Sequence, residues 1–102
     1  MEFKELHDAI IKVVEIYGKK FKIKIDENFA LLKLYEEVGE FAQSVLIHRK
    51  KCKPEKHMTK NKSKKMVANE LADILGLVIL NAHLLGIDLQ KTIEEKWLIH
   101  KG

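Results

Sequence analysis

The chain has 102 residues, enough for one domain with one hydrophobic core. Its composition, 46% hydrophobic and 33% charged with one proline and five glycines, is too apolar for a disordered chain and too poor in turn formers for an all-β sandwich. The only cysteine, Cys52, cannot form an internal disulfide, which indicates a reducing compartment. The charged N-terminus does not resemble a signal peptide, and the longest strongly apolar stretch, residues 74–80, is too short to span a bilayer. We therefore expect one cytoplasmic all-α domain over residues 1–102, with no membrane span.

Two helices are predicted in the first half of the chain. Apolar residues recur at steps of three and four over residues 3–17, and Gly18 is a natural helix stop. Residues 21–25 alternate like a strand but have no partner strand, so we expect an extended linker that packs its apolar side chains on the rest of the domain. Asp26 can cap a second helix, whose apolar stripe runs over residues 27–48.

Positive charge is concentrated in one segment between the predicted helices. Residues 49–65 contain nine Lys or Arg and one acid, Glu55, which gives the segment a charge of +8. The rest of the chain sums to −4, because the total is +4. The segment holds the only proline and few apolar residues, so we expect a mobile basic loop at about 49–65. It either attracts polyanions, such as nucleotide phosphates or nucleic acid, or serves only solubility.

Two further helices follow this basic loop. Apolar periodicity restarts at Met66 and ends at Gly86, a candidate left-handed cap. Asp88 can cap a final helix over residues 89–98. The third helix is apolar almost all round, which is more than three neighbouring helices would cover. We therefore predict a four-helix, bundle-like fold assembled as a homo-oligomer.

Acidic residues interrupt the apolar faces of the second and third helices. Glu37 and Glu40 lie three residues apart on one, and Glu70 and Asp73 lie three apart on the other. Residues at this spacing are neighbours on a helix surface. Because both pairs flank inward positions, we expect all four carboxylates to converge where the two helices pack together. Gly39 weakens a helix, which is reasonable where another group approaches the backbone closely.

Such a cluster requires neutralisation. Two unit charges 4 Å apart repel by about 4 kcal/mol at an effective dielectric constant of 20, and a domain of this kind has a total stability of only about 5–15 kcal/mol. Protons or cations must therefore compensate the charge. Ligation by oxygen alone favours hard ions, so we expect Mg²⁺, with Mn²⁺ as the alternative.

The pattern Glu36-Glu37-x-x-Glu40, followed after 29 residues by Glu70-x-x-Asp73, resembles the signature of the MazG-like all-α nucleoside triphosphate pyrophosphohydrolases. The resemblance covers about residues 28–96. It implies a MazG-like helical fold assembled as a homodimer or homotetramer, dependence on Mg²⁺, and cleavage of a nucleoside or deoxynucleoside triphosphate between its α and β phosphates. The products would be a nucleoside monophosphate and pyrophosphate.

The resemblance also assigns roles to individual residues. The metal ligands would be Glu37, Glu40, Glu70 and Asp73. Glu36 would lie outside the ligand set or orient the attacking water, and Lys96 resembles a lysine that approaches the phosphates. The chain departs from the family at its end, where His100 stands in place of a frequent asparagine and only Lys101 and Gly102 follow.

Several alternatives remain open from the sequence. Asn81 either contacts the nucleotide or satisfies a backbone group. The domain could bind nucleotides as a sensor without turnover, or act as a nucleic-acid or protein interaction module through the basic loop, although nucleic acid is not the partner we expect. The preferred base and sugar, the number of metal ions and the biological role do not follow from the sequence.

Overall fold

The computed structural model describes residues 1–100, apart from the side chain of His100. Lys101 and Gly102 lie outside the described residues, so the expected difference from the MazG-like family at these positions lies outside them too. The elements in chain order are α1 (Phe3–Phe21), α2 (Glu27–His48), a short 3₁₀ turn η1 (Pro54–Lys56), α3 (Lys60–Leu84), α4 (Leu89–Trp97) and a second 3₁₀ turn η2 (Leu98–His100). No strand occurs between residues 1 and 100, so the all-α prediction is confirmed.

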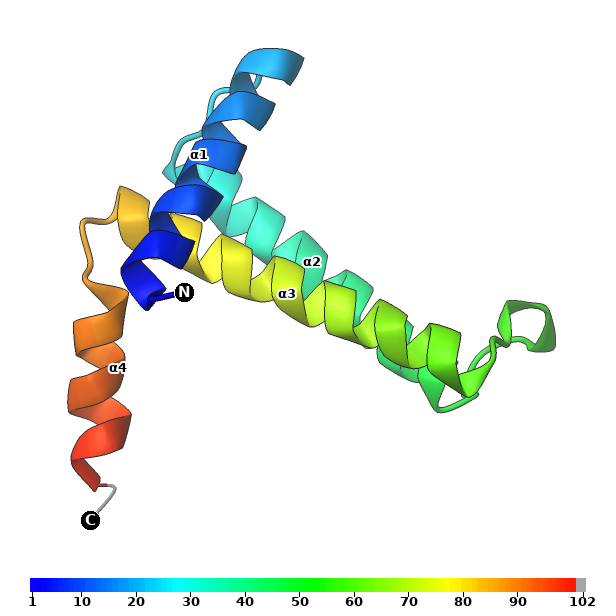
Figure 1. The fold of residues 1–102 in the computed structure, drawn as a ribbon. Helices are drawn as coiled ribbons and strands as arrows, with labels where there is room; N and C mark the ends of the chain where they lie inside the picture. The colour runs from blue at the N-terminus through cyan, green and yellow to red at the C-terminus, as the bar shows by residue number, and fades with distance from the viewer. Residues whose placement is uncertain (101–102) are drawn as a thin grey trace.

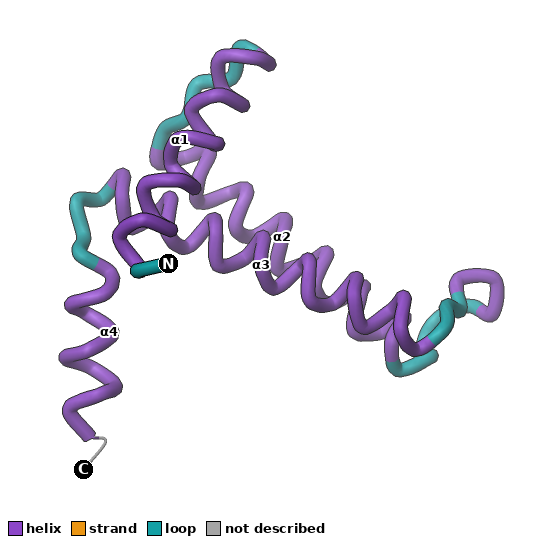
Figure 2. The backbone as a smooth tube through the Cα atoms, in the orientation of Figure 1, coloured by secondary structure: helices purple, strands orange, loops and turns teal. Residues whose placement is uncertain are grey.

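The helices do not close into a four-helix bundle within one chain. Helices α2 and α3 form a long antiparallel hairpin, α1 crosses one end of it, and α4 projects away from that same end (Figures 1 and 2). The radius of gyration is 16.3 Å, whereas a compact domain of about 100 residues measures about 13 Å. A single copy of the chain is therefore an open arrangement of helices.

The hydrophobic core lies where α1 crosses the hairpin. Its buried members are Ile11 of α1, Ala30 of α2, and Ile79 and Leu80 of α3. Toward the other end of the hairpin the buried positions are Ser44 and Ser63, each 1% exposed, and their small side chains let α2 and α3 approach closely. The core thus fixes one end of the hairpin, and close packing of small residues fixes the other.

Helix α1 is one turn longer than predicted. It passes through Gly18 and ends at Phe21, and Lys22 then adopts a left-handed conformation with φ of 55°. Gly18 has a different role from the predicted stop: a Cβ there would lie 2.8 Å from Cγ1 of Ile25. The returning linker therefore packs against the bare backbone of Gly18, and Ile25 reaches the core as expected.

Capping residues place the other helix ends. The Asp26 carboxylate accepts a hydrogen bond from the Phe29 backbone N–H at 2.9 Å, so the predicted start of α2 is confirmed. Helix α3, however, begins at Lys60 instead of Met66, because the Thr59 hydroxyl accepts from the Lys62 N–H at 3.3 Å and caps the helix there. The last six residues of the expected basic loop are therefore helical.

The turn from α3 into α4 has the predicted form. Gly86 is left-handed with φ of 70°, and the Ile87 N–H donates to the Ala82 carbonyl at 2.8 Å, which closes the end of α3. The Asp88 carboxylate accepts from the Lys91 N–H at 3.0 Å and caps α4. Apart from Leu89, every residue of α4 is exposed.

Large apolar side chains remain exposed along α2. Leu31, Tyr35, Val38 and Leu46 recur at helical spacing on one side of the helix, and Tyr35 is 69% exposed. Helix α3 is also long and apolar enough to cross a membrane by length and composition. Core helices of soluble proteins meet the same criterion, so it decides nothing about location, and the predictions of a cytoplasmic protein and of an oligomer stay predictions.

Candidate metal centre

Acidic side chains from α2 and α3 converge midway along the hairpin. Glu37 of α2 and Glu70 and Asp73 of α3 each place a carboxylate oxygen within 4.8 Å of the other two. The spacing of three residues puts Glu70 and Asp73 on adjacent turns of α3, and the packing of the two helices brings Glu37 to them. The predicted meeting of acids from two separate helices is confirmed for these three residues.

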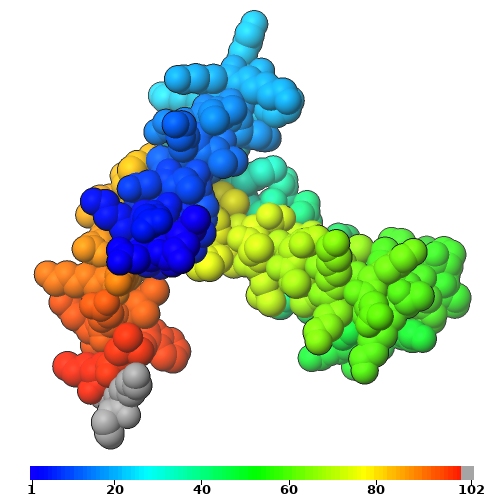
Figure 3. All heavy atoms as spheres, viewed as in Figure 1, coloured from blue at the N-terminus to red at the C-terminus, as the bar shows by residue number. Residues whose placement is uncertain are grey.

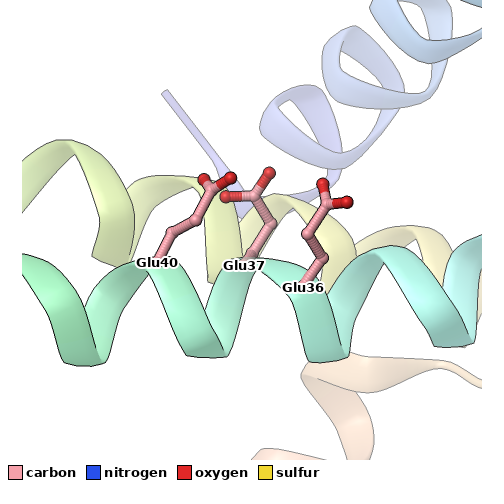
Figure 4. A group of neighbouring side chains, drawn as sticks. All are labelled: Glu36, Glu37 and Glu40. Carbon is pink, nitrogen blue, oxygen red and sulfur yellow. The ribbon is translucent and has the colours of Figure 1, made fainter.

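A second acidic group lies along α2. Carboxylate oxygens of Glu36, Glu37 and Glu40 also lie within 4.8 Å of one another. Figure 4 shows the three side chains on the same side of α2, with the carboxylates of Glu37 and Glu40 close together and Glu36 farther toward the start of the helix. Because Glu37 belongs to both groups, it is the centre of the cluster, and the two groups together contain all five predicted acids.

Burial and the charges of neighbouring acids raise the pKa values of Glu37 and Glu70. The pKa of Glu37 is raised from its usual 4.5 to about 7, mostly by burial and also by hydrogen bonding to Glu40 and by the charges of Glu40, Asp73 and Glu70. Burial also raises the pKa of Glu70, with the charges of Glu40 and Asp73 acting in the same sense. The site therefore disfavours its own negative charge.

No side-chain cation compensates the inner acids within residues 1–100. The only ion pairs in that range join His7 to Asp8 and Lys33 to Glu36, the latter at 2.6 Å between Nζ and Oε1. Lys33 thus neutralises the outermost acid, and hydrogen bonding to Glu36 raises the pKa of Lys33. Glu37, Glu40, Glu70 and Asp73 form no ion pair with any described residue, so their negative charge is not compensated by a side chain there.

Two buried oxygen atoms at the centre of the cluster have no partner. Oε2 of Glu37 and Oε2 of Glu70 are buried and accept no hydrogen bond in the described part of the chain. Buried polar atoms are normally satisfied, so two such oxygens at a convergence of carboxylates are suited to binding a cation. The donor set consists of oxygen alone, which suits Mg²⁺ or Mn²⁺. Glu37, Glu70, Asp73 and Glu40 therefore fit the divalent ion that we expected.

The side-chain amide nitrogen of Asn81 is hydrogen-bonded to the backbone of two helices. Its amide nitrogen donates to the Ala30 carbonyl at 3.0 Å and to the Leu77 carbonyl at 2.7 Å. Both N–H groups are thereby used, one of them to join α3 to α2 beside the core. The structure supports the backbone role of Asn81, one of the two alternatives that the sequence left open, and the role of Asn81 in substrate binding stays a prediction.

Lys96 does not reach the acids within one chain. It lies on α4, whose residues at that end are exposed and which projects away from the hairpin (Figure 1). The expected approach of Lys96 to the phosphates therefore does not form inside a single copy. Its placement depends on how α4 packs, and the sequence pattern of α4 carried no information on that.

Gly39 does not have the close neighbour that we expected from the sequence. A Cβ built on Gly39 would have no described atom within 4 Å, so the close approach to the backbone that we expected there is not found in the described residues.

A hollow of about 460 Å³ lies between α1 and α3, lined by apolar residues such as Ile10, Val13 and Leu77, and Asp73 is also part of its lining. The sequence could not show this hollow, because it depends on the angle at which α1 crosses α3.

Comparison with known proteins identifies no relative: no family model, no curated protein and no solved structure matches the chain.

Proposed function

We propose that this protein hydrolyses a nucleoside triphosphate or deoxynucleoside triphosphate between its α and β phosphates, with Mg²⁺ as cofactor. The observation that carries the proposal is the convergence of Glu37, Glu70 and Asp73 within 4.8 Å across two helices. Two carboxylate oxygens there are buried without a partner. This is the arrangement expected of a cation site, and the acid spacing resembles that of the MazG-like pyrophosphohydrolases.

Each acid has a distinct part in this proposal. Glu37, Glu40, Glu70 and Asp73 would hold the ion, which when bound supplies positive charge against the phosphate oxygens. Burial favours protonation of Glu37 and Glu70, so these residues lose protons as they take up the ion. Lys33 holds Oε1 of Glu36 and leaves Oε2 free to accept a hydrogen bond from the attacking water. No side-chain nucleophile is needed.

A place for the organic part of the substrate lies next to the acids. The hollow between α1 and α3 has a volume of about 460 Å³ and an apolar lining, within the range of small-molecule pockets. Asp73 borders it, so a nucleoside in this hollow would have its phosphates directed at the cluster. This geometry favours a nucleotide over inorganic polyphosphate as substrate.

We also propose that the protein acts as a homodimer or homotetramer. The open shape, with a radius of gyration of 16.3 Å, leaves large apolar side chains of α2 exposed. A second copy covering these residues would bury the surface that one chain leaves open. Assembly would also give α4 and Lys96 a surface on which to pack.

The experiment is a panel of ribonucleoside and deoxyribonucleoside triphosphates with Mg²⁺, in which the products are identified by chromatography and ³¹P NMR. We expect a monophosphate and pyrophosphate, and Asp73→Asn should lower the rate by at least two orders of magnitude. Glu15→Gln, which removes an exposed acid of α1, is the matched control and should leave the rate unchanged. Diphosphate with free phosphate as products, or no turnover of any nucleotide, would contradict the proposal.

A further inference from the structure

The strongest concentration of unpaired positive charge in the molecule lies at one end of the hairpin, beyond the acidic cluster. Residues 49–65, which we call the basic tip, form the turn between α2 and α3 at the end of the hairpin opposite α1 and α4 (Figure 1, green). In the space-filling view this region forms a separate lobe at one end of the molecule (Figure 3). It carries nine Lys or Arg and one acid.

The basic tip has a defined backbone. After α2, Lys50 adopts a left-handed conformation with φ of 56°, and the Lys51 N–H donates to the Leu46 carbonyl at 2.8 Å. The 3₁₀ turn η1 follows, and α3 then begins within the tip. These local hydrogen bonds define the backbone of the turn from which the lysine side chains extend.

A partly buried hydrogen bond joins the two sides of the basic tip. Nδ1 of His48 lies 2.7 Å from Oγ of Ser63, and that hydroxyl donates its own proton to the Lys60 carbonyl at 3.1 Å. Ser63 has only one proton to give, so the His48 ring must donate through Nδ1–H. The end of α2 and the start of α3 are thus fastened together beneath the lysines.

None of the cations of the basic tip is paired with an acid. Both ion pairs found in residues 1–100 lie elsewhere, one in α1 and one in α2. Lys51, Lys53 and Lys56 line one part of a hollow of about 340 Å³ at the base of the tip, and residues such as Leu46 and Ile47 line the rest. Four more lysines lie in the first two turns of α3, where the helix dipole disfavours positive charge. The arrangement concentrates positive potential at the tip, which favours binding of an anion.

The chemistry of the basic tip selects among anions. It contains no Phe, Tyr or Trp, so it offers no platform on which single-stranded bases could stack. No large apolar side chain between residues 49 and 65 is among the exposed ones, which removes the anchor that a membrane-binding surface uses. Eight of its nine cations are lysines, which act as point charges and suit phosphates better than base edges.

We propose that the basic tip binds the phosphate backbone of double-stranded nucleic acid without sequence preference. A duplex presents about one negative charge per 1.7 Å of its axis, a density that can match a lobe of charge +8. A single nucleoside triphosphate cannot neutralise so many cations. The tip and the acidic cluster use different residues, so duplex binding and nucleotide hydrolysis can be tested with separate substitutions.

Fluorescence anisotropy with a labelled duplex of about 24 base pairs, from about 50 to 300 mM NaCl, tests the proposal. If the tip contacts about five phosphates, the logarithm of the association constant should fall with the logarithm of salt concentration with a slope of about −4 to −5. The triple variant Lys51→Gln, Lys53→Gln, Lys56→Gln should bind at least tenfold more weakly at 50 mM NaCl. Its slope should be shallower by about 2 to 3.

The matched control removes the same charge elsewhere. Lys4→Gln, Lys12→Gln, Lys19→Gln on α1 should change the affinity less than about threefold and leave the salt slope unaltered. Equal weakening by both triple variants would show that net charge alone acts, and would overturn the proposal. If the tip variant loses helicity by circular dichroism, the three single substitutions are measured instead, and each should reduce the slope by about 0.9.

Three further binding measurements, with duplex, with single strands and with lipid vesicles, identify the partner. Absence of duplex binding at 50 mM NaCl, tighter binding to single strands, or binding to phosphatidylserine vesicles but not to duplex would each contradict the proposal. Duplex DNA and duplex RNA are compared directly, since both present the same phosphate chemistry. The variant Glu37→Gln, Glu70→Gln should bind duplex as the unmodified protein does, so failure of duplex binding and failure of hydrolysis are distinguishable.

Discussion

The substitution Glu37→Gln should stabilise the protein when no metal is present, although it changes a residue of the proposed site. The pKa of Glu37 is raised to about 7 from 4.5, mainly by burial. The folded state therefore binds more protons than the unfolded state between these values. The contribution of Glu37 to the free energy of unfolding is therefore highest below about pH 4.5 and falls as the pH rises through about 7. Glutamine is neutral at every pH and escapes this loss.

The magnitude follows from the pKa. The interval from 4.5 to about 7 corresponds to about 3 kcal/mol at about 1.4 kcal/mol per pKa unit. Because Glu37 is only half-buried, solvent screening reduces the expected gain to about 1–2 kcal/mol. For a domain of this size that is a rise in Tm of roughly 4–16 °C at pH 8, and the difference should vanish at pH 4.5.

Thermal unfolding followed by circular dichroism in EDTA, from pH 4.5 to 8.5, measures this effect. The neighbouring substitution Glu36→Gln is the control: it removes an exposed ion pair with Lys33, and Glu36 is not among the charges that raise the pKa of Glu37. It should change the stability by no more than about 0.5 kcal/mol, without a trend in pH. A loss of stability in Glu37→Gln at pH 8, or a difference independent of pH, would refute the electrostatic account.

Three other predictions follow from the same structure. Millimolar Mg²⁺ should raise the Tm of the unmodified protein, more at pH 8 than at pH 5 because protons compete for the carboxylates, and Glu37→Gln, Glu70→Gln should remove the rise. Gly18→Ala should lower the free energy of unfolding by about 1–3 kcal/mol, because the new Cβ would overlap the returning linker. Gly39→Ala has open space around its Cβ and should raise the free energy of unfolding by about 0.5–1 kcal/mol. A loss of stability in Gly39→Ala would show that a second copy packs there. Asn81→Ala should lower the free energy of unfolding by about 1–3 kcal/mol in denaturant titrations, since the bond between helices is lost, and retained stability would count against that role.

The acidic cluster was accessible from the sequence because it depends on local geometry. Side chains three residues apart on a helix are neighbours whatever the rest of the fold does, so Glu70 and Asp73 could be paired with confidence in their spacing alone. That Glu37 would meet them required only that the two apolar helices pack as a hairpin. The start of α2 was equally local, since it depends on one carboxylate, Asp26.

Other features depended on tertiary contacts that periodicity does not encode. Gly18 could be recognised as a special position, but its purpose became visible only with Ile25 folded back against it. The start of α3 was placed six residues late because a run of lysines was read as loop, although Thr59 is a good N-cap residue. The direction of α4, and with it the position of Lys96, depends on surfaces that one chain leaves uncovered.

Titration with Mn²⁺ followed by electron paramagnetic resonance, at pH 8 and low ionic strength, tests most directly whether the acids of the hairpin form a divalent cation site. The account predicts saturable binding of one or two ions per chain, competition by Mg²⁺, and loss of binding in Glu37→Gln, Glu70→Gln while Glu15→Gln binds normally. Free Mn²⁺ signals that rise in proportion to the added metal, or equal binding by all three proteins, would contradict it.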